Sequence, residues 1–402
     1  MAAIGSGPLP APDAYASARI RCLGTLKAVA IAIALLLVVA ASVIFHLVTP
    51  WWTTPLASNW GAMDDTLAIT VAVTGLFFVV INLFVVYSLW RYRHRDGLRA
   101  AYEPENKRVE RWLTGITTVG IVALLAPGLV VYARYVDPPA EALELEVLGQ
   151  QWQWRFRMPG ADGKFGGSEV RFVTGENPFG LDPADPVAQD DLLVDANEVH
   201  LPAGRPVKVL MRSHDVLHDF FVPQFRARMN IVPGQVSWFW FTPTRPGRFE
   251  SMCAQLCGVG HPAMRGFVVV EEEERWRAWL QGQRTFAMAL AKADPATGAG
   301  PLDLLQRGRA LAQSKGCSAC HTVDGRPGVG PTWKGLYGKT ETFADGSTAH
   351  VDEAFLRGFI LDPKARNVKG FAPVMPKIDL DADEIDALVA YIKAQSDAPE
   401  RR

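Results

Sequence analysis

The sequence predicts a multi-domain membrane protein with transmembrane α-helices at its N-terminus, a β-sandwich or Greek-key barrel in the middle and an all-α domain at its C-terminus. Long uncharged apolar stretches indicate the first part. Short aromatic runs separated by turn residues indicate the second, and apolar residues at helical spacing indicate the third. With 402 residues the chain has room for two or three domains, and its net charge of −1 argues against nucleic acid as a partner.

Three stretches in the N-terminal membrane region, residues 1–137, are long and apolar enough to cross a bilayer. They lie at about 28–49, 66–90 and 112–133, and without amphipathic periodicity they do not fit helices buried in a soluble core. The first has a rival interpretation as a signal sequence, but its length and the lack of a small-residue cleavage site favour retention. Basic residues before the first stretch and between the second and third place those segments in the cytoplasm.

The segment after the membrane region is therefore expected on the outer side. Within 138–280, alternating runs such as "LELEVLGQQWQWRFRM" and "QVSWFWFTPT" predict strands of a β-sandwich. Residues 281–300 are rich in Ala, Gly and Pro and predict a linker. Residues 301–396 return to helical spacing and form the predicted C-terminal domain.

A C-x-x-C-H motif opens the C-terminal domain with Cys317, Cys320 and His321. In an exported segment this motif is typical of covalent c-type haem attachment, with the histidine as an iron ligand. The alternative is a redox or structural disulfide. Met375, between prolines in "FAPVMPKIDL", is the candidate sixth iron ligand, although a methionine there could also pack in the core.

A second cluster of metal-ligand residues, in "SMCAQLCGVGHPAM", holds Cys253, Cys257, His261 and Met264 within twelve residues. Methionine is a poor zinc ligand, whereas two thiolates, an imidazole and a thioether suit copper. Two cysteines four residues apart can bridge two copper ions. A Cys253–Cys257 disulfide is the structural alternative.

Each copper ion would then need one imidazole, and His261 supplies only one. The segment "MRSHDVLHDFFVP" offers His214 and His218, of which one is required. Met264 would be a weak axial ligand to one copper, and the backbone carbonyl of Gln255 is the most plausible ligand to the other.

The segments "DVLHDFFVP" and "CAQLCGVGHPAM" together resemble the binuclear copper A site of cytochrome c oxidase subunit II. The resemblance covers about residues 66–280 and implies a cupredoxin-like domain in which His218, not His214, is the ligand. It also implies that electrons enter at Trp152, the first tryptophan of "GQQWQW". The last domain resembles class I cytochromes c through "GVGPTWKGLYG", so the chain is similar to subunits II with a C-terminal cytochrome c fusion.

The resemblance implies a subunit that passes electrons from haem c through copper A to the haem-copper centre of subunit I, where oxygen is reduced to water. The catalytic centre then lies in another subunit. The expected partners are subunit I, other oxidase subunits, the membrane and an external donor, which could be a cytochrome, a copper protein or a quinol–cytochrome c reductase. The expected location is the bacterial plasma membrane, with both metal domains on the periplasmic or extracellular side.

The alternative function is the same relay in a copper A-containing nitric oxide reductase, because the sequence departs from the family at two positions. Gln255 stands where the family usually has a glutamate that helps to hold a magnesium or manganese ion, so the sequence does not predict that interface ion. Glu110 lies near the position of a proton-entrance glutamate, but it fits a solvated interfacial charge equally well. A copper chaperone is disfavoured because it would need no covalent haem.

Overall fold

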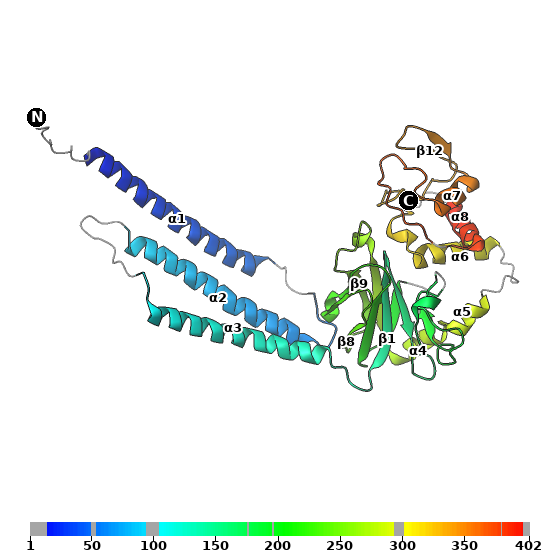
Figure 1. The fold of residues 1–402 in the computed structure, drawn as a ribbon, viewed down its shortest axis with the longest axis horizontal. Coiled ribbons are helices and arrows are strands. Elements are labelled where there is room, and N and C mark those ends of the chain that lie inside the picture. The colour runs from blue at the N-terminus through cyan, green and yellow to red at the C-terminus, as the bar shows by residue number, and fades with distance from the viewer. Residues whose placement is uncertain are drawn as a thin grey trace, which may run out of the picture. The chain divides into compact units, whose positions relative to one another are not determined.

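The computed structural model describes residues 14–49, 54–93, 104–174, 177–194, 197–292, 301–378 and 380–396. It divides into two compact units, of which the first comprises residues 1–53 and 62–131 and the second comprises residues 54–61 and 132–402. Figure 1 shows long helices in the first unit, and a β-sandwich and a smaller helical domain in the second. These are the three kinds of structure that the sequence predicts.

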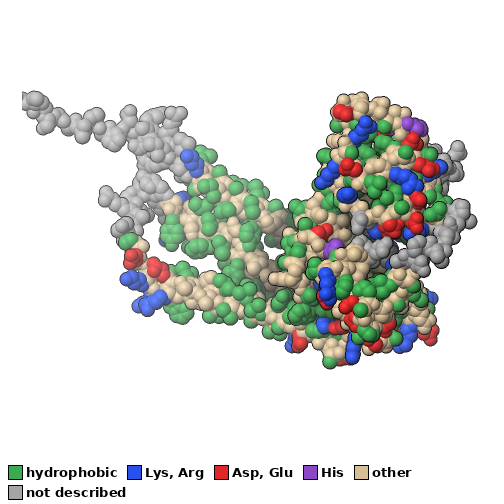
Figure 2. Space-filling view, turned by 45° about the vertical axis from the view of Figure 1, so that its right-hand side comes forward, with side chains coloured by type: hydrophobic (Ala, Val, Ile, Leu, Met, Phe, Trp, Pro, Cys, Tyr) green, Lys and Arg blue, Asp and Glu red, His purple; other side chains and the backbone are tan. Residues whose placement is uncertain are grey.

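The first unit contains most of three long helices: α1 (Ala14–Val48), α2 (Gly61–Arg91) and α3 (Lys107–Tyr135), the last of which ends in the second unit. Their segments Leu26–Val48, Gly61–Arg91 and Lys107–Tyr135 are long and apolar enough to span a membrane. Figure 2 shows many hydrophobic side chains along these helices, with charged side chains at one end of them and scattered over the surface of the other domains. Such apolar surfaces require lipid or partner helices, so these are membrane helices.

Two mixed sheets form the β-sandwich. One has the strand order β11-β3-β2-β1-β5-β8, and the other has the order β4-β10-β9-β6-β7. The strands of the first are β1 (Leu143–Gln150), β2 (Gln153–Met158), β3 (Leu192–Val194), β5 (Val207–Ser213), β8 (Ser237–Phe241) and β11 (Arg284–Thr285). Those of the second are β4 (Glu198–Pro202), β6 (His218–Val222), β7 (Ala227–Ile231), β9 (Gly247–Cys253) and β10 (Arg265–Glu271).

Aromatic side chains fill much of the space between the sheets. Trp154 packs edge-to-face on Phe220 at 5.1 Å between ring centroids, and Phe225 packs on Phe241 at 4.8 Å. Each of these four side chains is at most 1% exposed. Alternation along the strands places Trp154, Phe220 and Phe241 on inner faces, and Phe225 joins them from the 3₁₀ turn Pro223–Phe225 that follows β6.

Aromatic residues of the sandwich also bind the last residues of α3, which belong to the second unit. Tyr135 stacks on Phe239 with ring centroids 5.2 Å apart, and the Trp240 indole donates a hydrogen bond to the carbonyl of Arg134 at 2.6 Å. The Trp238 indole donates to the carbonyl of Val136 at 3.0 Å. These donors satisfy carbonyl groups that a helix end leaves without intrahelical partners.

A buried ion cluster supports the first sheet. The Arg157 guanidinium bonds to a carboxylate oxygen of Glu146 at 2.5 Å and to one of Asp191 at 3.0 Å, and all three side chains are at most 4% exposed. Burial raises the pKa of Asp191 to about 6, although Arg157 and the Gly166 amide lower it. The guanidinium is therefore needed to offset the burial of two carboxylates.

We expect Arg157→Leu to lower the free energy of unfolding by about 3–5 kcal/mol, because it leaves Asp191 buried without its counter-charge and Glu146 with Arg212 as its remaining partner. Arg171→Leu is the control, since the Arg171–Glu169 pair is exposed by 67% and 51% and such pairs contribute about 0–1 kcal/mol. Thermal unfolding of the full chain in detergent measures both changes. Equal stability of the two variants would contradict the prediction.

The predicted linker at 281–300 is shorter in the structure. α4 (Glu273–Gln281) is followed by β11, which pairs with β3, and by α5 (Phe286–Lys292). Phe286 is 1% exposed and packs with Phe179 and Leu181, so residues 284–292 belong to the sandwich. Residues 293–300, the rest of the predicted linker, lie outside the described residues.

The C-terminal domain contains α6 (Pro301–Ser314), α7 (Glu353–Leu361), α8 (Ala382–Ser396) and a small hairpin of β12 (Thr340–Thr342) and β13 (Thr348–His350). Trp333, Leu356 and Leu388 are among its buried core residues. The Lys315 ammonium lies 2.9 Å from the Glu384 carboxylate, and both side chains are about nine-tenths buried. This pair ties the segment just before Cys317 to α8.

Candidate metal centres

The loop with Cys253, Cys257, His261 and Met264, here called the copper loop, forms a cluster with His218 where the start of β6 lies beside the end of β9. β6 begins at His218, β9 ends at Cys253, and Phe220 is paired with Cys253 in the antiparallel register. This pairing brings a histidine from one strand to the cysteine at the end of the next. The loop after β9 then returns through a short 3₁₀ turn, His261–Ala263, into β10.

The sulfur and nitrogen atoms of this loop converge. Cys253 Sγ lies 3.7 Å from Cys257 Sγ and 3.9 Å from His218 Nδ1. Cys257 Sγ lies 3.6 Å from His261 Nδ1 and 3.8 Å from Met264 Sδ. Both cysteines are free, so the disulfide alternative is not what the structure contains. Two sulfurs at the centre with one nitrogen beside each is the arrangement expected around two bridged soft metal ions.

Hydrogen bonding favours the thiolate form of Cys253, whereas the hydrogen bond with Cys253 and then burial raise the pKa of Cys257. Cys253, Cys257 and Met264 are at most 7% exposed, and His218 is fully buried. Hydrogen bonds from Cys257 and then His218 hold the pKa of Cys253 well below that of an ordinary thiol. The carbonyl oxygen of Gln255 lies 3.1 Å from Cys253 Sγ. The thiolate form and the carbonyl are both donors that copper accepts.

Asp215 orients His218 and was not singled out in the sequence. Its Oδ1 lies 2.8 Å from His218 Nε2, which leaves Nδ1 facing the cysteine, and its Oδ2 accepts from the Gln151 amide at 2.7 Å. A carboxylate on the far nitrogen of a ligand histidine fixes the ring and its tautomer. The D-x-x-H spacing was the available signal. His214, by contrast, is exposed and lies outside the cluster.

Trp152 packs directly against the copper loop. Its indole donates to the Cys257 carbonyl at 3.0 Å, and the side-chain amide (Nε2) of Gln151 donates to the same oxygen at 2.8 Å. A Cβ built on Gly260 would lie 2.2 Å from the Trp152 ring, so only glycine permits this contact. Trp154, the other tryptophan of that run, lies in the core, 1% exposed.

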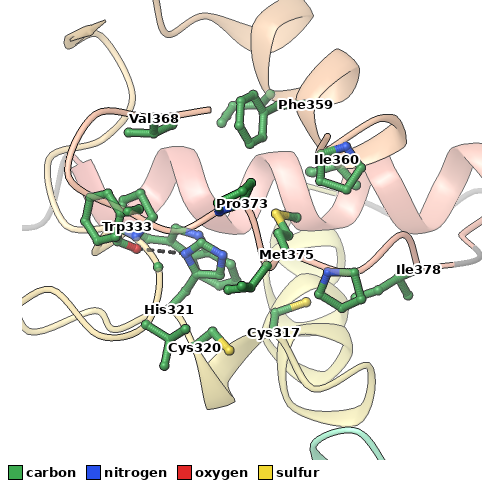
Figure 3. A pocket seen from close by; sticks show the side chains of 18 of the residues that line it. Cys317, Cys320, His321, Trp333, Phe359, Ile360, Val368, Pro373, Met375 and Ile378 are labelled. Atoms are coloured by element: carbon green, nitrogen blue, oxygen red, sulfur yellow. Dashed lines mark hydrogen bonds between the residues drawn. The ribbon is translucent and has the colours of Figure 1, made fainter. Parts of the chain in front are cut away.

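A large apolar pocket occupies the C-terminal domain (Figure 3). Cys317, Cys320, His321 and Met375 all line it, together with hydrophobic side chains from α7, α8 and the loop before Met375. Burial raises the pKa of the Cys317 thiol to about 12. The sequence motif and the predicted sixth ligand are thus brought to one cavity of the kind that encloses a flat apolar cofactor.

His321 is held in one tautomer by its surroundings. Its Nδ1 lies 2.8 Å from the Pro331 carbonyl, which accepts its proton, and its ring stacks on Trp333 at 5.2 Å. Burial lowers the pKa of His321 and keeps the ring neutral. Nε2 is then the nitrogen available to iron. A Cβ built on Gly330 would lie 2.7 Å from the His321 ring, so glycine is needed there for the ring to fit.

Comparisons with known proteins agree with this architecture. Residues 143–272 match the family "Cytochrome C oxidase subunit II, periplasmic domain", and residues 305–396 match the family "Cytochrome c". The alternative cytochrome c oxidase subunit 2 of Bradyrhizobium diazoefficiens is 54% identical over 258 residues, which are 64% of this chain and 93% of that protein. The chain belongs to the cytochrome c oxidase subunit 2 family.

Subunit 2 of Cereibacter sphaeroides is more distant, at 27% identity over 61% of this chain and 83% of that one. The crystal structure of the periplasmic domain of subunit II of Bradyrhizobium japonicum cytochrome oxidase covers 36% of this chain and 94% of its own, with 24% identity and a TM-score of 0.26.

This cytochrome c oxidase subunit 2 carries a fused cytochrome c domain and provides electron input to a haem-copper terminal oxidase complex. It has membrane helices and a periplasmic copper-loop domain. The cytochrome c domain implies haem c, and the His218, Cys253 and Cys257 cluster is consistent with a copper A site.

Proposed function

We propose that this subunit takes electrons into its haem c domain and passes them through a binuclear copper A centre to the haem-copper centre of subunit I for the reduction of oxygen to water. The observation that carries the proposal is the convergence of two free cysteine sulfurs with two imidazole nitrogens and a thioether at 3.6–3.9 Å. When bound, copper A and haem c each carry one electron at a time.

In this proposal the copper ligands are those of the described cluster. Cys253, Cys257, His218, His261 and Met264 would hold the copper ions, and the Gln255 carbonyl would complete the ligand set. Asp215 keeps His218 oriented. Because the side chains are buried and fixed by strand ends, they need little movement when the electron arrives, which favours rapid transfer.

In the haem domain, Cys317 and Cys320 would hold the haem covalently, and His321 and Met375 would supply the ligands to its iron. Pro331 keeps the proton on the far nitrogen of His321. Trp152 is the proposed point where electrons enter the copper domain, because its indole is bonded to the Cys257 carbonyl. We propose that the chain comprises a membrane region (residues 1–137), a copper-binding domain (138–280), a linker (281–300) and a cytochrome c domain (301–396). Within the linker range, residues 284–292 are attached to the sandwich through the pairing of β11 with β3.

The external donor is proposed to be a cytochrome, a copper protein or a quinol–cytochrome c reductase, and the host is a bacterial plasma membrane. We propose no magnesium or manganese ion at Gln255, because an amide is a weaker ligand for hard cations than a carboxylate. Glu110 lies exposed in the first turn of α3. Its position there suits a charge at the membrane interface.

The deciding experiment compares oxygen and nitric oxide consumption by the purified complex under matched conditions with one reduced cytochrome donor. Rapid oxygen uptake with little nitric oxide turnover is expected. Faster nitric oxide consumption would assign the relay to a copper A-containing nitric oxide reductase, and Gln255 would then mark the loss of the interface ion.

We expect Met264→Leu to keep both copper ions but to shift their midpoint potential, because an axial thioether is a weak ligand whose main effect is on potential. Met211→Leu is the matched control, since both methionines are fully buried and the exchange conserves volume. Potentiometric titration followed by the copper A absorbance measures the shift. Loss of copper from the Met264 variant alone would contradict the axial role.

A further inference from the structure

Arg228, on β7, places a positive charge beside the copper loop. Its Nε donates to Oδ2 of Asp219 at 2.9 Å, and its Nη2 lies 3.4 Å from the carbonyl oxygen of Ala254. Ala254 stands between Cys253 and Gln255, two of the proposed ligands. The guanidinium therefore reaches the backbone at the centre of the ligand set.

Asp219 binds the other backbone polar group of Ala254, its N–H. The backbone carbonyl of Asp219 accepts from the Ala254 amide at 3.0 Å. Together, Asp219 and Arg228 bind both the N–H and the C=O of Ala254. A loop residue held at both polar groups has little freedom to move, so the position of the Gln255 carbonyl is fixed from outside the loop.

The Asp219 carboxylate is 2% exposed, and its Oδ1 has no hydrogen-bond partner among the described residues. A buried carboxylate with one unsatisfied oxygen is costly unless a counter-charge is fixed close to it. Arg228 is the side chain that the structure pairs with it.

The backbone of Arg228 is itself anchored. The Tyr135 hydroxyl accepts from the Arg228 amide at 2.8 Å and lies 3.2 Å from the Arg228 carbonyl, to which it donates. Tyr135 is the last residue of α3 and is 3% exposed. The Arg228 side chain that reaches Ala254 therefore extends from a backbone that Tyr135 holds in place.

We propose that Arg228 is a positioning residue for electron transfer: it fixes the copper loop through Ala254, and its charge favours the reduced copper centre. The inference rests on the proposed copper function. A fixed positive charge near a partly buried redox site stabilises the added electron. Because Asp219 carries the opposite charge, loss of the Arg228 charge would leave an unbalanced buried carboxylate beside the loop, which disfavours an added electron at the copper centre.

The competing interpretation is an ordinary surface ion pair, and the chain offers a matched control. Arg228 and Arg248 are both 53% exposed, and each donates from Nε to a carboxylate, at 2.9 and 2.7 Å. The Glu198 side chain that pairs with Arg248 is 32% exposed, whereas that of Asp219 is 2% exposed. Arg248→Gln thus removes a charge of equal exposure away from the copper loop.

The test measures how one electron is shared at equilibrium between haem c and copper A in the assembled oxidase, with haem c as the internal reference. In Arg228→Gln we expect a shift of about tenfold towards haem c, which corresponds to ~59 mV for one electron. Copper content and haem c absorbance should be unchanged. Arg228→Lys keeps the charge and should retain most of the wild-type distribution, and Arg248→Gln should not change it.

An unchanged distribution in a copper-loaded Arg228→Gln variant would overturn the inference. If that variant does not assemble, Arg228→Lys decides: a wild-type distribution supports the role of the charge, and a tenfold shift overturns it. Failure of both variants to assemble, with Arg248→Gln intact, would show a purely structural residue and also overturn the inference. A wild-type oxidase without binuclear copper would instead refute the proposed function.

Discussion

Cys253→Ser and Cys257→Ser should each abolish the mixed-valence copper spectrum and lower oxygen turnover by more than about 100-fold. Removing a residue that only hydrogen-bonds to a metal ligand can already cost up to about 100-fold in activity, and the loss of a ligand itself should cost more. The two sulfurs lie 3.7 Å apart at the centre of the cluster, and each lies beside a different imidazole. A serine hydroxyl is a hard and neutral donor, so it cannot replace a bridging thiolate between soft ions.

Haem c should be unaffected in both variants, because its ligands lie in a separate domain with its own core. Absorbance of the reduced haem and electron paramagnetic resonance of the copper distinguish the two centres in one sample. Cys22→Ser, in α1, is the control for the removal of a thiol. Loss of the haem absorbance in the Cys253 variant would mean that the two centres do not form independently.

Much of the copper site could be predicted because its chemistry is concentrated in one loop. Cys253, Cys257, His261 and Met264 lie within twelve residues, so no arrangement of the strands can separate them widely. The haem motif is local for the same reason, since the Cys320 and His321 amides both bond back to the Cys317 carbonyl. In both motifs the spacing alone limits the geometry.

The remaining features depend on contacts between distant segments. From the residues alone, His214 and His218 were equal candidates, and it is the pairing of Phe220 with Cys253 that brings His218 to the sulfurs. The Arg157 cluster joins residues from three strands or loops, and Arg228 reaches Ala254 only because β7 lies beside β6. Nothing in the local pattern indicates such pairings.

The segment after Pro178 contributes to the core although its composition does not indicate this. Its aspartates and prolines are typical of a polar surface loop, but Leu181 and Ala188 are fully buried. Asp185 accepts from the amide of Val187 in its own turn and from the amide of Gly167, which is distant in the sequence. A segment rich in turn residues can therefore still contribute to a core when its few apolar side chains find one.

Met375→Leu should leave haem c covalently attached but should lower its midpoint potential and open the iron to external ligands. The exchange nearly conserves volume, which costs less than about 1.5 kcal/mol in a packed site, so the pocket around His321 should keep its shape. The thioether is what raises the potential of a His/Met haem, and leucine offers no donor atom in its place.

Carbon monoxide binding to the reduced protein gives the direct measurement, because a six-coordinate haem c excludes it and a five-coordinate one binds it. The wild type and Met288→Leu, a control at a methionine that is 59% exposed, should show no carbon monoxide complex at haem c. The lower potential should also slow reduction by the external donor, while copper A, held by its own ligands, keeps its spectrum. If Met375→Leu still excludes carbon monoxide, the sixth ligand must be another of the residues that line the pocket.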